Sequence, residues 1–193
     1  GLDKIYAAVN FFPIQSQTRQ DEIDDAFSFH YLDWGIYLNE LGDYAKAVDK
    51  FEYLLSHYPE ADEAETAYEA AAQAYVDWAV QASGEEDYVQ AASNLDIVLH
   101  TYDKSIAVAE AEQMLPVTYL NSAMQLVTQS HYLLAMERLE TAKELGLSSV
   151  QEQEADDEYQ NAIQLLARDD GEDGKIVMNE ALEQSCTGTI PRQ

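Results

Sequence analysis

The chain has 193 residues, of which 47% are hydrophobic and 10% aromatic, and only four prolines and eight glycines interrupt it. This composition provides enough apolar surface for a sizeable core and excludes a largely disordered chain. The 37 acidic residues outnumber the 10 basic ones, and the net charge of -27 repels nucleic-acid phosphates and anionic membrane surfaces, which excludes both as partners.

Segments rich in Ala, Glu, Leu, Gln and Tyr predict an all-α protein without a sheet. In chain order, we expect helices near residues 2–12, 20–41, 44–58, 62–83, 86–102, 105–129, 131–145, 151–168 and 173–184. Glycine or proline separates most of them, at Pro13, Gly42, Pro59, Gly84, Gly146 and residues 171–174. Pro116 falls within a helical pattern and is expected to kink or restart that helix. No apolar run reaches the roughly 18 residues of a membrane span, so we expect no membrane insertion.

One residue pattern recurs three times at intervals of 44 residues. The copies begin with Tyr31-Leu-Asp-Trp34-Gly35, Tyr75-Val-Asp-Trp78-Ala79 and Tyr119-Leu-Asn-Ser122-Ala123. At constant distances there follow a tyrosine (Tyr44, Tyr88, Tyr132), an alanine (Ala47, Ala91, Ala135) and a large apolar residue (Phe51, Leu95, Leu139). Self-similarity at a fixed period predicts a solenoid in which each repeat packs against the next.

The repeat organises the chain into a single helical domain over residues 1–184. Residues 2–13 align with residues 48–59, so the chain opens with the second half of a repeat, and we expect that an upstream part has been removed or is not included. Repeats follow at about 20–59, 62–103, 105–147 and 151–184, the last being fainter, as terminal repeats often are. Residues 185–193 form a tail that contains Cys186, the only cysteine, which excludes an internal disulfide.

Small residues mark where helices approach most closely. Glycine inside a helix costs about 1 kcal/mol relative to alanine, so Gly35 suggests a contact that even a methyl group would disturb. Ala79 and Ala123 hold the equivalent positions. We expect Trp34 and Trp78 to fill the space between the paired helices.

The first copy resembles the tetratricopeptide repeat. The resemblance is carried by Tyr31, Trp34, Gly35, Leu38, Tyr44, Ala47, Phe51, Leu54 and Pro59. It implies a right-handed superhelix of antiparallel helix pairs. The family's usual period is about 34 residues, so the ten additional residues should lengthen the first helix of each pair by about 15 Å. Such long units are similar to those of bacterial envelope lipoproteins, which favours an extracytoplasmic location.

The resemblance also implies a concave groove, lined by the first helices, that receives a partner segment. The matching positions are Phe29, Leu32, Ile36, Asn39, Gln73, Val76, Val80, Leu120, Met124 and Val127. Because these residues are mostly apolar, the groove would take an apolar or amphipathic segment. Alternatively, the long helices close on one another and bury these residues as core.

Residues 169–180 resemble the calcium-binding loop of the EF-hand, with Asp169, Asp173 and Glu180 as candidate ligands. Gly171 stands where a further oxygen ligand is usual, and Gly174 is also where the repeat predicts a turn. The four histidines lack ligand spacing, no nucleophile accompanies them, and we expect neither a cofactor nor enzymatic activity.

The sequence therefore predicts a non-catalytic adaptor that binds an apolar or basic protein segment. One alternative is a structural subunit that self-associates end to end in a larger envelope or extracellular complex. Another is an envelope protein stabilised by calcium.

Overall fold

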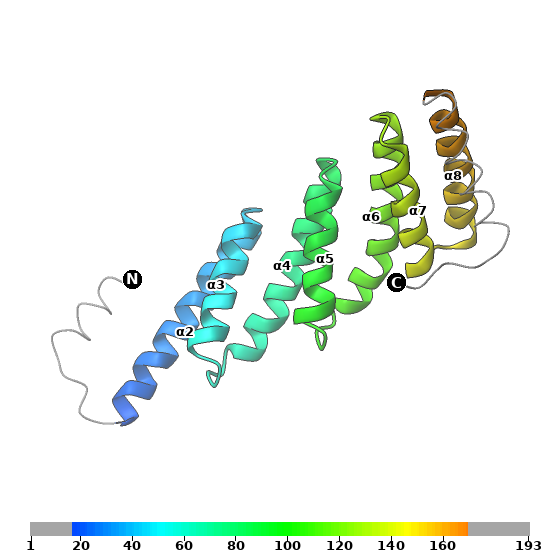
Figure 1. Ribbon diagram of the computed structural model, residues 1–193. Helices are drawn as coiled ribbons and strands as arrows, with labels where there is room; N and C mark the ends of the chain where they lie inside the picture. The colour runs from blue at the N-terminus through cyan, green and yellow to red at the C-terminus, as the bar shows by residue number, and fades with distance from the viewer. Residues whose placement is uncertain (1–16, 170–193) are drawn as a thin grey trace. The chain divides into compact units, whose positions relative to one another are not determined.

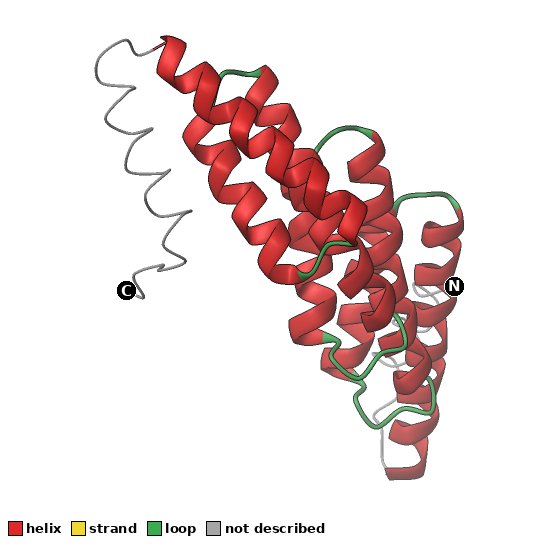
Figure 2. Ribbon diagram, turned by 90° about the vertical axis from the view of Figure 1, so that its right-hand side faces the viewer, coloured by secondary structure: helices red, strands yellow, loops and turns green. Residues whose placement is uncertain are grey.

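The computed structural model describes residues 17–169, and every regular element within them is a helix (Figure 2). This confirms the all-α prediction for that part of the chain. The expected half-repeat at 2–13, the helix at 173–184 and the tail at 185–193 lie outside the described residues.

The helices follow one another through short connections (Figure 1). They are α2 (Gln17–Glu40), α3 (Tyr44–His57), α4 (Ala64–Gly84), α5 (Tyr88–Thr101), α6 (Val108–Thr128), α7 (Tyr132–Leu145) and α8 (Ser149–Asp169). As expected, α4 and α6, with 21 residues each, are longer than α3, α5 and α7, with 14 each. Part of the additional sequence, at residues 60–63 and 104–107, forms the preceding turn instead. The helix α6 continues through Pro116, so the expected alternative of a restart there is wrong.

The backbone repeats with the same 44-residue period as the sequence. The bounds of α4 recur in α6, and those of α3 recur in α5 and α7. In all three copies the first helix of the pair ends in the same type of turn. A residue with positive φ and the residue after it each donate a backbone hydrogen bond to the last turn of that helix. The positive-φ residues are Gly42 (74°), Glu86 (61°) and Ser130 (64°). Residues 44 apart therefore occupy equivalent backbone positions.

This turn is a Schellman motif, which satisfies carbonyl groups at the end of a helix. In the first copy, the Gly42 amide donates to the Asn39 carbonyl at 2.9 Å and the Asp43 amide to the Leu38 carbonyl at 3.0 Å. The same two bonds recur from residues 86 and 87 and from residues 130 and 131. The chain thus reverses in the same way after α2, α4 and α6.

The chain divides into two compact units, with the boundary after Glu112, inside α6. In the first unit, α2 and α3 pack antiparallel, as do α4 and α5 (Figure 1), and α3 also packs against α4. The prediction of one domain over residues 1–184 extends beyond the described residues and stays a prediction.

The helices α2 and α3 approach each other closely at Gly35 on α2. A Cβ added there would be 2.7 Å from Phe51 Cδ1 and 2.8 Å from Cζ, with Cε1 closer still. Phe51, on α3, is 1% exposed. The expected close contact at Gly35 is confirmed, because the aromatic ring occupies the space that a methyl group would need.

The tryptophans occupy equivalent positions but do not both fill the helix interface. The ring of Trp34 lies 6.4 Å from that of Tyr31, and the ring of Trp78 lies 6.3 Å from that of Tyr75. Trp34 is nevertheless 42% exposed, and the Lys50 ammonium lies 4.6 Å from its ring centre. The expectation that Trp34 fills the space between α2 and α3 is wrong, because Phe51 takes that place.

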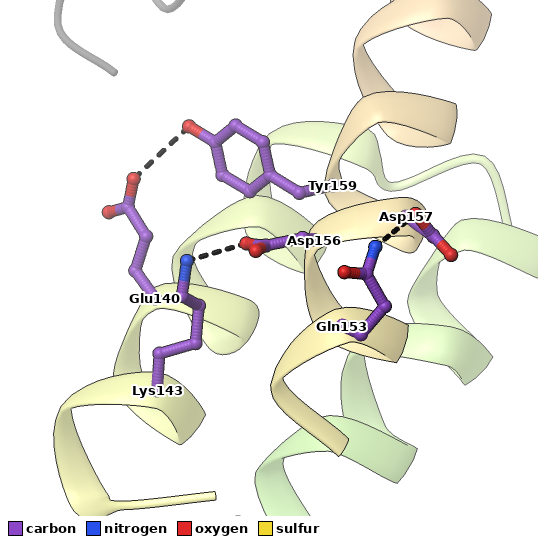
Figure 3. Close-up of polar contacts among 6 residues, drawn as sticks. All are labelled: Glu140, Lys143, Gln153, Asp156, Asp157 and Tyr159. Carbon is purple, nitrogen blue, oxygen red and sulfur yellow. Dashed lines mark hydrogen bonds and ion pairs between the residues drawn. The ribbon is translucent and has the colours of Figure 1, made fainter. Parts of the chain in front are cut away.

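The second unit has its own core between α6, α7 and α8. It includes Leu120, Val127, Met136, Leu139, Ile163 and Leu166. At the surface, Tyr159 of α8 donates a hydrogen bond to Glu140 of α7 at 3.1 Å, and Lys143 pairs with Asp156 at 2.6 Å (Figure 3). Burial, with Glu140 adding to it, raises the pKa of Tyr159 to about 12. The exposed ion pair contributes little to stability, whereas the apolar core holds the helices together.

Candidate partner-binding surface

The candidate site in the first unit begins where α2 meets α4. The side-chain nitrogen of Asn39 donates a long hydrogen bond of 3.5 Å to one carboxylate oxygen of Asp77. The side-chain nitrogen of Gln73 donates to the other oxygen of Asp77 at 3.1 Å. Both Asn39 and Gln73 were predicted groove residues. The shared carboxylate therefore joins two of the predicted positions across neighbouring helices.

Apolar side chains extend from this junction along both helices. Phe29, Leu32 and Ile36 precede Asn39 at helical spacing on α2, and Val80 lies three residues after Asp77 on α4. Phe29 is 57% exposed, Ile36 39% and Val80 52%, and Leu32 is half-buried. We call these four residues, together with Asn39, Gln73 and Asp77, the α2–α4 surface.

Carboxylates lie among these apolar groups. Asp33 and Glu40, both exposed, follow Phe29 and Ile36 by four residues on α2, a spacing that places them on the same side of the helix. Asp33 is equivalent to Asp77 in the 44-residue repeat. The surface thus presents exposed apolar side chains next to negative charge.

The other predicted groove residues lie in the protein interior. Val76 is fully buried in the first unit. In the second unit, Leu120 and Val127 are core residues, and Met124 is partly buried against the same core. Among the ten predicted positions, the exposed side chains are Phe29, Ile36 and Val80, all on the α2–α4 surface.

A network of tyrosines around Glu52 was not anticipated from the sequence. The Tyr75 hydroxyl donates to the Glu52 carboxylate at 2.7 Å, and the Tyr102 hydroxyl lies 3.4 Å from the same oxygen. Burial raises the pKa of both tyrosines, and the proximity of Glu52 raises them further. These phenols stay neutral at physiological pH and connect α3 with α4 and the end of α5, which is a structural role.

The candidate calcium loop falls at the edge of the described residues. Asp169 is the last residue of α8, whereas Asp173 and Glu180 lie outside the described part of the chain. Within residues 17–169, no group of three or more His, Cys, Asp or Glu side chains is arranged to hold a metal ion. None of the helices in that range combines the length and apolar character that crossing a bilayer requires.

A scan against models of protein families found no match for this chain, and a search of curated proteins found none either. The resemblance to tetratricopeptide repeats, the envelope location and the calcium loop stay predictions. The geometry of the α2–α4 surface is the evidence on which a function can be argued.

Proposed function

We propose that this protein is a non-catalytic adaptor whose α2–α4 surface binds an amphipathic helical segment of another protein. The observation that carries the proposal is the exposure of Phe29, Ile36 and Val80 on two adjoining helices. Large apolar side chains gathered on one face are typical of interaction sites. The right-handed tetratricopeptide-like superhelix of about four repeats belongs to the same proposal, because it provides such an inner face.

The chemistry of the surface specifies the partner. Apolar residues at successive helical positions would pack into the contacts that Phe29, Ile36 and Val80 offer. Lysine or arginine beside that apolar stripe would approach Asp33 and Asp77. The net charge of -27 also favours encounter with a positively charged segment.

Two synthetic peptides test this proposal. Both carry leucines at positions that would share one face of a helix. One peptide has lysines beside these leucines, and the other has glutamates. We expect the lysine peptide to bind more tightly in fluorescence anisotropy, and added salt to weaken its binding. Equal affinity for both peptides would contradict the proposed role of the carboxylates.

Substitutions locate the binding surface. The double variant Ile36→Ser with Val80→Ser should lose most of the affinity for the lysine peptide. The matched control is Leu133→Ser on α7, which removes an apolar side chain that is 57% exposed from the second unit. If both variants bind the peptide as the parent does, the α2–α4 surface is not the site.

A further inference from the structure

A second stripe, exposed at Trp34, Tyr37 and Leu41 and half-buried at His30, lies on another side of α2. It consists of His30, Trp34, Tyr37 and Leu41, which are three or four residues apart and so share one side of the helix. His30, Trp34 and Tyr37, with Asp33, line a shallow open hollow. We call these four stripe residues the end stripe, and Asp33 lies between it and the apolar residues of the α2–α4 surface.

Apolar residues surround α2 from Phe27 onward. Phe27, Tyr31 and Leu38 are buried, Phe29 and Ile36 belong to the α2–α4 surface, and the end stripe occupies a third side. A helix with apolar residues on all sides is typical of the interior of a protein. The composition of α2 therefore predicts that a further element covers the end stripe.

The equivalent side of α4 shows what such an element is. His30 and Trp34 correspond to Ala74 and Trp78 in the 44-residue repeat. Ala74 is fully buried and Trp78 is half-buried, whereas Trp34 is exposed. Besides α5, which packs on the side of Ala79, the principal neighbour of α4 is α3, the helix that precedes it in the chain.

The sequence before α2 has the pattern of α3. Residues 2–13 align with residues 48–59 and share an Asp-Lys pair and a closing proline with them. The proline is followed by α2 at Gln17 in one case and by α4 at Ala64 in the other. Such short connections place successive elements side by side.

We infer that residues 2–12 of this chain cover His30 and Trp34 as α3 packs on α4, whereas Tyr37 and Leu41 correspond to the exposed Gln81 and Glu85. Within α3, the Glu52 carboxylate accepts the hydrogen bond from Tyr75 of α4, and Leu55 lies three residues further on. Tyr6 and Val9 align with these two residues. On this inference, Tyr6 and Val9 would lie against α2 beside Trp34, and this part of the end stripe would be an internal contact of the chain.

Trp34 is the reporter that tests this inference. In the full chain carrying Trp78→Phe, fluorescence comes from Trp34 alone. The double variant Tyr6→Asp with Val9→Asp should shift this emission to longer wavelength and increase its quenching by acrylamide. Asn10→Asp, at a position that aligns with the exposed Ser56, should leave both unchanged.

A control in which Trp78 is the only tryptophan shows whether the effect is specific to Trp34. With Trp34→Phe, emission comes from Trp78, and the Tyr6/Val9 double variant should leave it unchanged. Deletion of residues 1–13 should reproduce the red shift of Trp34, with helix content checked by circular dichroism. Unchanged Trp34 emission in both the double variant and the deletion would overturn the inference. So would Trp34 emission that depends on protein concentration, since a second copy would then occupy the end stripe.

Discussion

Replacing Gly35 with alanine should destabilise the first unit, although alanine is the better helix former. A Cβ there would lie 2.7 and 2.8 Å from two atoms of the Phe51 ring, with a third atom closer still. The ring is buried and cannot move towards solvent. Overpacking costs about 1–3 kcal/mol, and glycine to alanine gains about 1 kcal/mol within a helix. Because three ring atoms conflict, the upper part of that range applies, which gives a net loss of about 1–2 kcal/mol.

Urea unfolding followed by circular dichroism and tryptophan fluorescence measures this loss. Gly84→Ala is the matched control, because an added Cβ there meets no atom within 4 Å. That variant should be neutral or stabilised by up to about 1 kcal/mol.

The second copy suggests a compensating change. Ala79 and Leu95, both fully buried, stand where the first copy has Gly35 and Phe51. Combining Gly35→Ala with Phe51→Leu should therefore recover part of the loss, with a coupling energy of about 1 kcal/mol in a double-mutant cycle. A Gly35→Ala variant as stable as the parent, or strictly additive energies, would refute the argument from close packing.

Three further outcomes follow from the contacts described above. Glu52→Gln should lower the pKa of Tyr75, because a neutral amide no longer opposes phenolate formation. Absorbance titration measures this pKa. An unchanged pKa would leave burial as the sole cause of the shift. The pKa of Tyr159 rises from 10.0 to about 12 on folding, so stability should fall as pH increases between these values, when only the unfolded phenol ionises. Solvent screening reduces this loss of stability to about 1 kcal/mol. Urea midpoints measured across this pH range should fall less in Tyr159→Phe than in the parent protein. Equal falls in both proteins would contradict the role of Tyr159. Leu133→Ala, at a side chain that is 57% exposed, should cost less than about 1 kcal/mol, against the 2–5 kcal/mol expected for the fully buried Leu54→Ala, and thermal unfolding showing the reverse order would contradict the observed burial.

The helical architecture was predictable because its signal is local and repeated three times. The position of the turn within each repeat was less so. Gly84 suggested a break, yet it is the last residue of α4, and the positive φ falls on Glu86. Backbone hydrogen bonds fix that conformation, and the same bonds form in the first copy around Gly42. The amino-acid sequence alone identifies such a turn only where glycine, which adopts positive φ readily, occupies the positive-φ position.

Accessibility at the candidate site depended on tertiary packing. Val76 and Val80 are identical residues on one helix, yet the first is fully buried and the second is 52% exposed. Leu32 and Leu120 likewise differ in their neighbours rather than in their chemistry. The Glu52 network joins residues 23 and 50 positions apart, and no local pattern relates them. The repeat pattern therefore indicated candidate positions, but tertiary packing decided which of them are exposed.

The three Schellman turns carry unequal strain. Gly42 adopts its positive φ freely, whereas Glu86 and Ser130 hold nearly the same angle with a Cβ attached. A left-handed residue other than glycine raises the energy of the folded state by roughly 1–2 kcal/mol. Glycine at either position would relieve this strain, although at Ser130 it would also remove the hydrogen bond that the Tyr132 hydroxyl donates to the Ser130 side chain at 3.2 Å.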